Sequence, residues 1–171
     1  MREKYEKYST LVLDLDGTLI ETIQGNPFPK GVWDMRIKWD AWDGIGYLLR
    51  NVNSILIASN QGGISIGKVN ESCFKAKILY VAAALRDYLK YKYDLEVVVD
   101  TRYCPSNKPC DMRKPNIGML SNSFVGLTPK DSILFIGDAT DKRCAENFGV
   151  DYMDVRDFIK DYNTTKIIED V

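Results

Sequence analysis

The chain has 171 residues, of which 45% are hydrophobic and 11% are aromatic. A domain of this size buries about 70% of the surface that its unfolded chain exposes, so it can fold without disulfides or a structural metal. The 23 lysines and arginines nearly balance the 24 aspartates and glutamates, which excludes a strongly basic, histone-like nucleic-acid binder. The sequence contains no histidine, and this excludes mechanisms that use an imidazole as base, nucleophile or metal ligand.

The first ten residues contain no apolar stretch of the kind found in signal peptides. The longest apolar run, residues 78–85, is well short of the roughly 20 residues that span a bilayer. We therefore expect a cytoplasmic protein, a monomer without membrane contact or a stable protein partner, whose four cysteines are free thiols. No cysteine is followed by the Cys-x5-Arg spacing of thiol phosphatases, so that mechanism is excluded as well.

Short apolar runs rich in β-branched residues predict strands that are buried on both faces of a parallel sheet. Helical periodicity fills two of the intervals, and Asn70 is the expected N-cap of the second helix. The expected strands cover 11–13, 55–58, 97–99, 133–136 and 150–153, and the expected helices cover 41–51, 70–91 and 155–162. This alternation predicts an α/β fold: a Rossmann-like, open, mainly parallel sheet with helices on both faces. We expect one domain over residues 1–171, with an ordered core at about 9–162 and no large cap domain.

Acidic or hydroxyl side chains follow three of the predicted strands. Asp14 and Asp16 follow the first, Ser59 ends the second, and Asp138 follows the fourth. The carboxyl ends of parallel strands open onto one crevice, so these side chains are expected to converge there. Because Asp14 and Asp16 are two residues apart, their carboxylates should project to the same side. Two carboxylates that lie close together repel each other unless a cation neutralises them or one of them stays protonated, and hard oxygen ligands of this kind favour Mg²⁺.

A histidine-free site of this composition can still run covalent catalysis. An aspartate is ionised at neutral pH, so Asp14 can attack phosphorus and form an aspartyl ester. Asp16, if its pKa is raised, can protonate the leaving oxygen and later activate water. The substrate that most needs a divalent cation and a positively biased cleft is a phosphate monoester.

Two further segments can hold a phosphate group. Ser59, Asn60, Gln61 and the backbone amides that follow are candidate phosphate ligands, because Gly62 and Gly63 allow close approach. Lys114 can balance the charge of Asp14 and of the phosphoryl group. The Pro115 and Asn116 that follow it are expected to begin a helix.

In order and spacing, these pieces resemble the haloacid dehalogenase-like hydrolase superfamily. The matching residues are the Asp-x-Asp-Gly-Thr run of Asp14 to Thr18, then Ser59, Lys114, the Gly137-Asp138 pair and Asp141. The resemblance implies that Asp14 is phosphorylated, that Asp16 is the acid and base, and that Mg²⁺ is bound by Asp14, by the Asp16 carbonyl and by Asp138. Asp141 is a further possible metal ligand, but it lies three residues after Asp138 instead of the usual four.

Two branches of that superfamily compete. The segment from Thr18 to Ile37 resembles the 3′-phosphatase domain of polynucleotide kinase/3′-phosphatase. The Cys104 to Met112 segment resembles the zinc loop of heptose-bisphosphate and histidinol phosphatases, but Ser106 and Met112 replace two of its four ligands. We therefore expect no zinc, because tetrahedral zinc needs four ligands.

The substrate expected from the first resemblance is the 3′-phosphate end of a polynucleotide, DNA in particular, as in DNA repair. Four aromatic residues lie on or near the flap over residues 17–40: Phe28, Trp33, Trp39 and Trp42. They either stack on bases or pack in the core. The expected substrate-binding residues are Thr18, Phe28, Lys68 and Arg113, within a basic rim that adds Arg102, Lys108, Lys142 and Arg143.

Other classes of function remain as alternatives. A small-molecule phosphatase of the heptose-bisphosphate or histidinol-phosphate type is the main one. A phosphate-binding or signalling module is the alternative without enzyme activity, although a receiver-type domain needs its acceptor aspartate where Ser59 stands. A nucleotide-binding loop at Gly62 to Lys68 is disfavoured, because Val69 replaces the hydroxyl ligand of magnesium.

Overall fold

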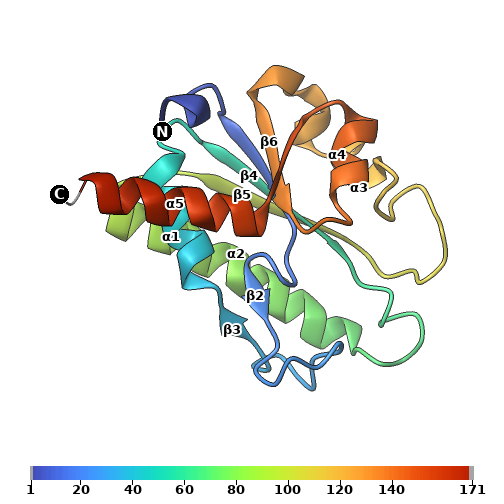
Figure 1. The fold of residues 1–171 in the computed structure, drawn as a ribbon. Helices are drawn as coiled ribbons and strands as arrows, with labels where there is room; N and C mark the ends of the chain where they lie inside the picture. The colour runs from blue at the N-terminus through green and yellow to red at the C-terminus, as the bar shows by residue number, and fades with distance from the viewer. Residues whose placement is uncertain (1, 170–171) are drawn as a thin grey trace.

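The computed structural model describes residues 2–169. A five-stranded sheet forms its centre, in the order β5-β4-β1-β6-β7 (Figure 1). The strands are β1 (Thr10–Leu13), β4 (Ser54–Asn60), β5 (Val98–Cys104), β6 (Ile133–Gly137) and β7 (Asp151–Asp154). Every neighbouring pair in this sheet is parallel. The α/β fold with an open parallel sheet, predicted from the sequence, is confirmed.

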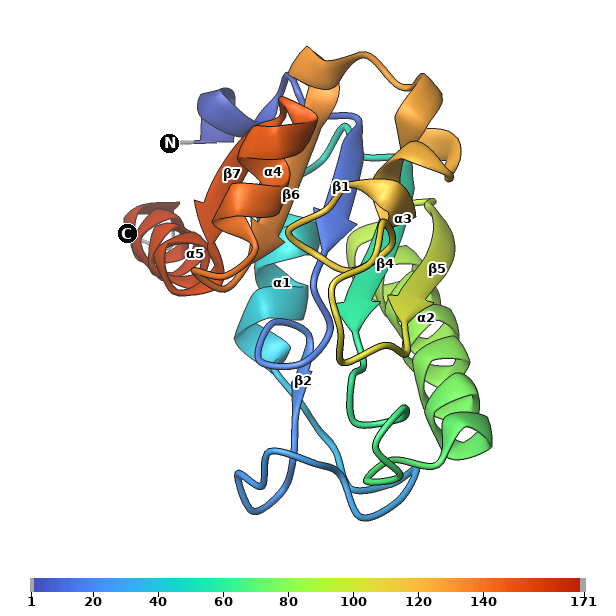
Figure 2. The ribbon, with the colours of Figure 1, turned by 90° about the vertical axis from the view of Figure 1, so that its right-hand side faces the viewer.

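Helices cover both faces of the sheet (Figures 1 and 2). One face packs against α1 (Trp39–Leu48), α2 (Glu71–Tyr93) and α5 (Val155–Glu169), and the other against α3 (Gly118–Ser121) and α4 (Lys142–Phe148). Short 3₁₀ turns lie at Arg2–Tyr5, Phe124–Leu127 and Lys130–Ser132. The Asn70 side chain accepts a hydrogen bond from the Cys73 amide, so it is the N-cap of α2, as predicted. None of the helices within residues 2–169 is long and apolar enough to cross a membrane.

Three of the predicted elements need correction. The strand expected at 97–99 begins at Val98 and continues to Cys104, and it is partly exposed because it forms the edge of the sheet. The helix expected at Pro115 begins only at Gly118 and is one turn long, since a tight turn occupies the residues before it. The last helix continues past residue 162 to Glu169, and Phe158 on its inner face packs against the buried ring of Tyr5.

The flap at residues 17–40 contains a small antiparallel ribbon of β2 (Ile20–Glu21) and β3 (Arg36–Ile37). Both views place the loop between these strands beside the N-terminal end of α2 (Figures 1 and 2). Of the aromatics expected there, Trp42 lies in the core, where its indole N–H donates to the Leu19 carbonyl. Trp33 and Trp39 stay exposed and pack against Tyr80 and Tyr88 of α2.

The strand order places the reactive side chains. β1 lies between β4 and β6. From β1 the chain adds β4 and β5 on one side, and it then crosses to the other side of β1 to add β6 and β7. Ligands of open α/β sheets bind at such a switch point, outside the carboxyl ends of the strands. Asp14 directly follows β1, Ser59 lies at the end of β4, and Asp138 directly follows β6. The sheet therefore brings the three together, as the sequence analysis expected.

Candidate active site

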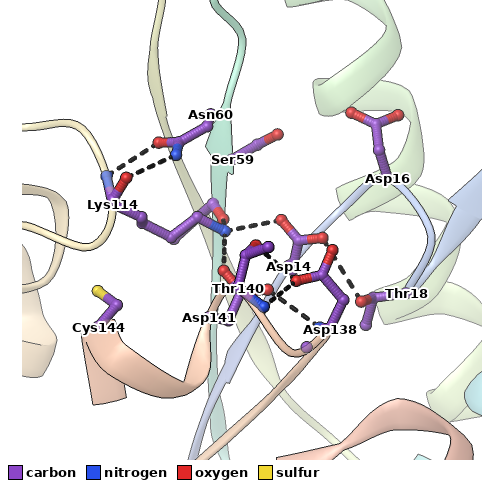
Figure 3. A network of polar contacts seen from close by, with 12 residues as sticks. Asp14, Asp16, Thr18, Ser59, Asn60, Lys114, Asp138, Thr140, Asp141 and Cys144 are labelled. Atoms are coloured by element: carbon purple, nitrogen blue, oxygen red, sulfur yellow. Dashed lines mark hydrogen bonds and ion pairs between the residues drawn. The ribbon is translucent and has the colours of Figure 1, made fainter. Parts of the chain in front are cut away.

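The carboxylate of Asp14 is at the centre of the site (Figure 3). Its backbone N–H donates to the Ile136 carbonyl, which fixes the residue against β6. One carboxylate oxygen, Oδ1, accepts a hydrogen bond from Lys114 Nζ at 2.7 Å. The other, Oδ2, is 3.5 Å from the donating hydroxyl of Thr18. Asp14 is therefore buried and held on both sides.

Lys114 is buried, and its ammonium group has three partners. Nζ lies 2.7 Å from Asp14 Oδ1, 2.6 Å from Asp141 Oδ1 and 2.8 Å from the carbonyl of Ala58. These use all three hydrogens of the group. Burial on its own lowers the pKa of Lys114, but the charges of Asp14 and Asp141 outweigh it, and the net shift is upward. The side chain is therefore a fixed positive charge beside Asp14.

Asp141 takes part in the site directly. Besides its ion pair with Lys114, its Oδ2 accepts a hydrogen bond from the Asp138 amide at 3.1 Å. A side chain at Gly137 would collide with this carboxylate, so the glycine is required for the approach. Burial raises the pKa of Asp141 to about 6, and the Lys114 charge opposes that rise. Its position three residues after Asp138 thus places it against the lysine.

The carboxylates of Asp14, Asp138 and Asp141 form an acidic cluster, with one oxygen of each within 4.8 Å of the others. Thr140 orients Asp138, because its amide and hydroxyl both donate to Asp138 Oδ1, at 2.7 and 2.6 Å. Three carboxylates face a single ammonium group, so the cluster keeps an excess of negative charge. This excess and the all-oxygen donor set fit a hard divalent cation such as Mg²⁺.

The carboxylate of Asp16 is outside this cluster, so the expectation that it projects beside Asp14 is wrong. Figure 3 shows it directed away from Asp14. The strand ends at Leu13 and the chain then turns, with the Leu15 carbonyl accepting from the amides of Leu19 and Ile20. The alternation of a strand therefore does not extend to Asp16.

Gln61 connects Asp16 with Ser59. Its amide nitrogen Nε2 donates to Asp16 Oδ2 at 2.6 Å and to Ser59 Oγ at 2.9 Å. Asp16 is exposed at the cleft, but the protein atoms around it partly desolvate its carboxyl group. This desolvation raises the pKa of Asp16, the hydrogen bond from Gln61 lowers it, and the charge of Asp14 raises it again, for a net rise. A carboxyl group with a raised pKa at the edge of a cleft is suited to proton transfer.

The side chain of Asn60 was expected to bind phosphate, but it is hydrogen-bonded to the backbone of Lys114 instead. Its Oδ1 accepts from the Lys114 amide at 3.0 Å and its Nδ2 donates to the Lys114 carbonyl at 2.9 Å. The backbone N–H of Gln61 also has a partner, because it donates to the Cys104 carbonyl at 2.7 Å. Ser59 and the amides beyond Gln61 remain the candidates for phosphate contact.

A cleft of about 600 Å³ opens beside Asp16, between the flap and the loop that follows β4. Phe28 and Arg113, two of the residues predicted to bind substrate, line it. Thr18 is buried beneath Asp14, so its expected contact with substrate is wrong. Lys68 lies outside this cleft, in the wall of an adjoining cavity, and its contact with substrate stays a prediction. The polar side chains that line the cleft are those of Asp16, Glu21, Thr22, Asn26, Asn60, Gln61, Asn107 and Arg113.

The expected basic rim is partly neutralised by neighbouring acids. Arg102 pairs with Asp100 at 3.2 Å, and Lys142 lies 4.0 Å from Glu146.

Cys104 and Cys110 belong to the segment that resembles a zinc loop. Both are free thiols, and their sulfur atoms lie 3.3 Å apart.

The sequence analysis missed the roles of Gln61, which it took for a phosphate ligand, and of Thr140. A hydroxyl two residues after an aspartate often forms a local turn with it, and this was the available signal for Thr140.

Comparison with known proteins identifies the family. The model of the polynucleotide kinase 3 phosphatase family matches residues 9–165. The chain belongs to this family. Its members are haloacid dehalogenase-like phosphatases, so the resemblance inferred from Asp14, Ser59, Lys114 and Asp138 is confirmed.

Heptose-bisphosphate phosphatases are relatives as well. The chain is 29% identical over 140 residues to the D-glycero-alpha-D-manno-heptose-1,7-bisphosphate 7-phosphatase of Campylobacter jejuni, a match covering 77% of this chain and 72% of that one. In fold, it is similar to the D,D-heptose 1,7-bisphosphate phosphatase of B. bronchiseptica, whose crystal structure contains magnesium and phosphate. That match has a TM-score of 0.66 and 20% identity, and it covers 84% of this chain and 78% of the other.

Proposed function

We propose that the protein is a magnesium-dependent phosphomonoesterase in which Asp14 is the nucleophile. The observation that supports this most directly is the position of the Asp14 carboxylate, buried against the Lys114 ammonium and next to two further carboxylates. An ionised carboxylate held in this way needs no base to activate it. Its Oδ2, which has the longer contact of the two, 3.5 Å from the Thr18 hydroxyl, attacks phosphorus. The ester P–O bond breaks, and an aspartyl phosphate forms on Asp14.

Asp16 is the proposed acid and base. It gives its proton to the leaving oxygen of the substrate, and it then takes a proton from the water that attacks the aspartyl phosphate. Gln61 orients the Asp16 carboxylate by its 2.6 Å hydrogen bond. That water breaks the bond between phosphorus and Asp14, so inorganic phosphate leaves and both carboxyl groups return to their starting states.

Asp14, Asp138 and the Asp16 carbonyl are the proposed ligands of Mg²⁺, with Asp141 as a further candidate. When bound, the ion would neutralise charge on the phosphoryl oxygens and allow the negatively charged Asp14 to approach them. Lys114 supplies a second positive charge on the other side of Asp14. Ser59, at the end of β4, is the proposed hydrogen-bond donor to a phosphoryl oxygen.

For the substrate, we propose the 3′-phosphate end of a polynucleotide. The family match over residues 9–165 supports this choice. The cleft beside Asp16 is open, and it has the ring of Phe28, 39% exposed, on its wall. An aromatic face of this kind can stack on a base, while the amide groups of the cleft can hydrogen-bond to base edges and sugar.

A sugar bisphosphate is the second candidate substrate. The relationship to a heptose-bisphosphate phosphatase favours it. The structure adds that Arg102 and Lys142 are paired with acids, which weakens a basic rim as a polynucleotide track. The many amide side chains in the cleft would also match the hydroxyl groups of a sugar.

The deciding experiment measures kcat/KM for a 3′-phosphorylated oligonucleotide, a 3′-mononucleotide, heptose 1,7-bisphosphate and histidinol phosphate. We expect the oligonucleotide to be the best substrate. If a small phosphate is preferred by about tenfold or more, which corresponds to about 1.4 kcal/mol, the polynucleotide assignment is wrong and the phosphomonoesterase assignment stands. If none is hydrolysed with Mg²⁺ present, the proposed function itself is wrong.

A further inference from the structure

A second cavity lies on the other side of Phe28 from the reaction cleft. It has a volume of about 350 Å³ and lies between the flap and the first turns of α2. Both cavities share Phe28, Pro29 and Val69 in their walls, so they adjoin. Three lysines line the second cavity, together with Asn70, Cys73 and Phe74 at the start of α2. We call it the tri-lysine cavity, after Lys30, Lys68 and Lys77.

Lys77 is the unusual member of this group. It is 3% exposed, on the buried side of α2. Within residues 2–169 its ammonium group has no hydrogen bond or ion pair. Burial lowers its pKa, and the charges of Asp16 and Asp34 only partly oppose this. The ammonium group itself is not fully enclosed by protein, so its hydrogens are available to a ligand that enters the cavity.

The surroundings favour an anion as that ligand. Three lysines line the cavity, and the side chains around them contain no carboxylate. Asp34 is nearby in the flap, but its carboxylate accepts hydrogen bonds from the backbone amides of Ile23 and Lys30, at 3.1 and 2.8 Å. The cavity also faces the N-terminal turns of α2, a helix of 23 residues whose dipole adds positive potential there.

From this geometry we propose that the tri-lysine cavity binds a second phosphate group of the substrate, one that is not hydrolysed. The inference rests on the proposed phosphomonoesterase function, because it places the reacting phosphate at Asp14 and the other beyond Phe28. Two substrate classes carry such a group. In a polynucleotide it is the phosphodiester next to the 3′ end, and in a sugar bisphosphate it is the phosphate on the opposite end.

The kinetic test compares substrates with and without the second phosphate. One pair is a 3′-phosphorylated dinucleotide and a 3′-mononucleotide, and the other is heptose 1,7-bisphosphate and heptose 7-phosphate. For the pair that contains the true substrate, we expect Lys77→Met to lower the preference for the member with two phosphate groups by roughly tenfold, the effect of losing one charged hydrogen bond. Lys75→Met is the matched control, because Lys75 is exposed on the same helix and pairs with Glu71 at 3.6 Å.

Lys68→Ala provides a second variant, since Lys68 is exposed and its replacement does not disturb the core. It should lower the same preference by a smaller factor. The substrate pair for which the variants change the preference identifies the substrate class. If neither variant changes the preference in either pair, the proposal is wrong.

A binding measurement separates this proposal from the proposed function. Inorganic phosphate is titrated into protein with ¹³C-labelled lysine, at constant ionic strength, while the Cε resonance that Lys77→Met removes is followed by NMR. A saturable shift of that resonance is expected. If there is no shift although the enzyme hydrolyses phosphate esters, the second site is refuted and the phosphatase stands. A shift in a protein without phosphatase activity would refute the proposed function and keep the anion site.

Discussion

The side chain of Asn60 forms two hydrogen bonds to the backbone of Lys114, one to its N–H and one to its carbonyl. The two residues are 54 positions apart, and the contact joins the end of β4 to the loop that follows β5. This contact therefore fixes the backbone position from which the Lys114 side chain extends to Asp14.

Asn60→Ala should therefore lower kcat more than it changes KM, because Lys114 loses its fixed position without losing its charge. We expect a decrease of about 10- to 100-fold. Asn60→Asp keeps the acceptor for the Lys114 amide and should recover part of the rate. Equal kcat in the wild type and in Asn60→Ala would show that the contact has no role in positioning.

Asp14→Asn should abolish turnover, since an amide cannot attack phosphorus. The expected loss is at least about 10³-fold, which corresponds to about 4 kcal/mol of transition-state stabilisation. Lys114→Ala and Asp138→Asn should be similarly severe, whereas Asp131→Asn, at an exposed position away from the site, serves as the control. Retention of more than about a tenth of the activity in Asp14→Asn would rule out an aspartyl nucleophile.

Removal of divalent cations with a chelator should abolish the activity, and added Mg²⁺ should restore it. The reason is the excess negative charge of Asp14, Asp138 and Asp141, which would otherwise repel a phosphate dianion. Activity that persists after dialysis against chelator would contradict the metal-dependent mechanism.

Zinc should be absent from protein purified without a chelator. Cys104 and Cys110 face each other, but Ser106 and Met112 stand where two further ligands would be needed. Elemental analysis decides the question, and one zinc per chain would overturn the expectation.

Acid should weaken the contact between α1 and α2. Asp43 of α1 accepts hydrogen bonds from Tyr88, Lys92 and Tyr93. Burial raises the pKa of this carboxyl group, but these three donors outweigh it and the net shift is downward. A folded-state pKa below the unfolded value of about 3.9 stabilises the fold above that pH, and the contribution disappears as the pH falls through the folded value.

Asp43→Asn should therefore lower the free energy of unfolding by about 1–3 kcal/mol at pH 7, and its difference from the wild type should shrink below about pH 4. Urea unfolding at both pH values measures this. Asp87→Asn is the control, because that carboxylate is about half exposed and pairs with its neighbour Arg86. A difference that is the same at both pH values would contradict the assignment.

The sequence was sufficient for the features that depend on local pattern. Short apolar runs located the strands, and the residues after them located Asp14, Ser59 and Asp138. The direction of Asp16 could not be predicted, because the alternation rule ends with the strand at Leu13. The contact between Asn60 and Lys114 depends on two segments that only the folded sheet brings together.

Lys77 is a case in which the sequence contained a signal that was not used. It follows Phe74 by three residues and precedes Val81 by four, so helical periodicity places it on the buried face of α2. A lysine on an apolar face needs an explanation, and the cavity supplies one only when the flap is also placed in space.

Phe28 divides the reaction cleft from the tri-lysine cavity, and its ring seats against Gly63, where a side chain would leave no room for it. Phe28 therefore stands between the cleft beside Asp16 and the cavity that we propose for a second phosphate. The enzyme would then select a substrate by the distance between its phosphate groups as well as by the chemical group that carries them. In this geometry a smaller or larger residue at position 28 shifts the preferred substrate length while the hydrolytic groups around Asp14 stay in place.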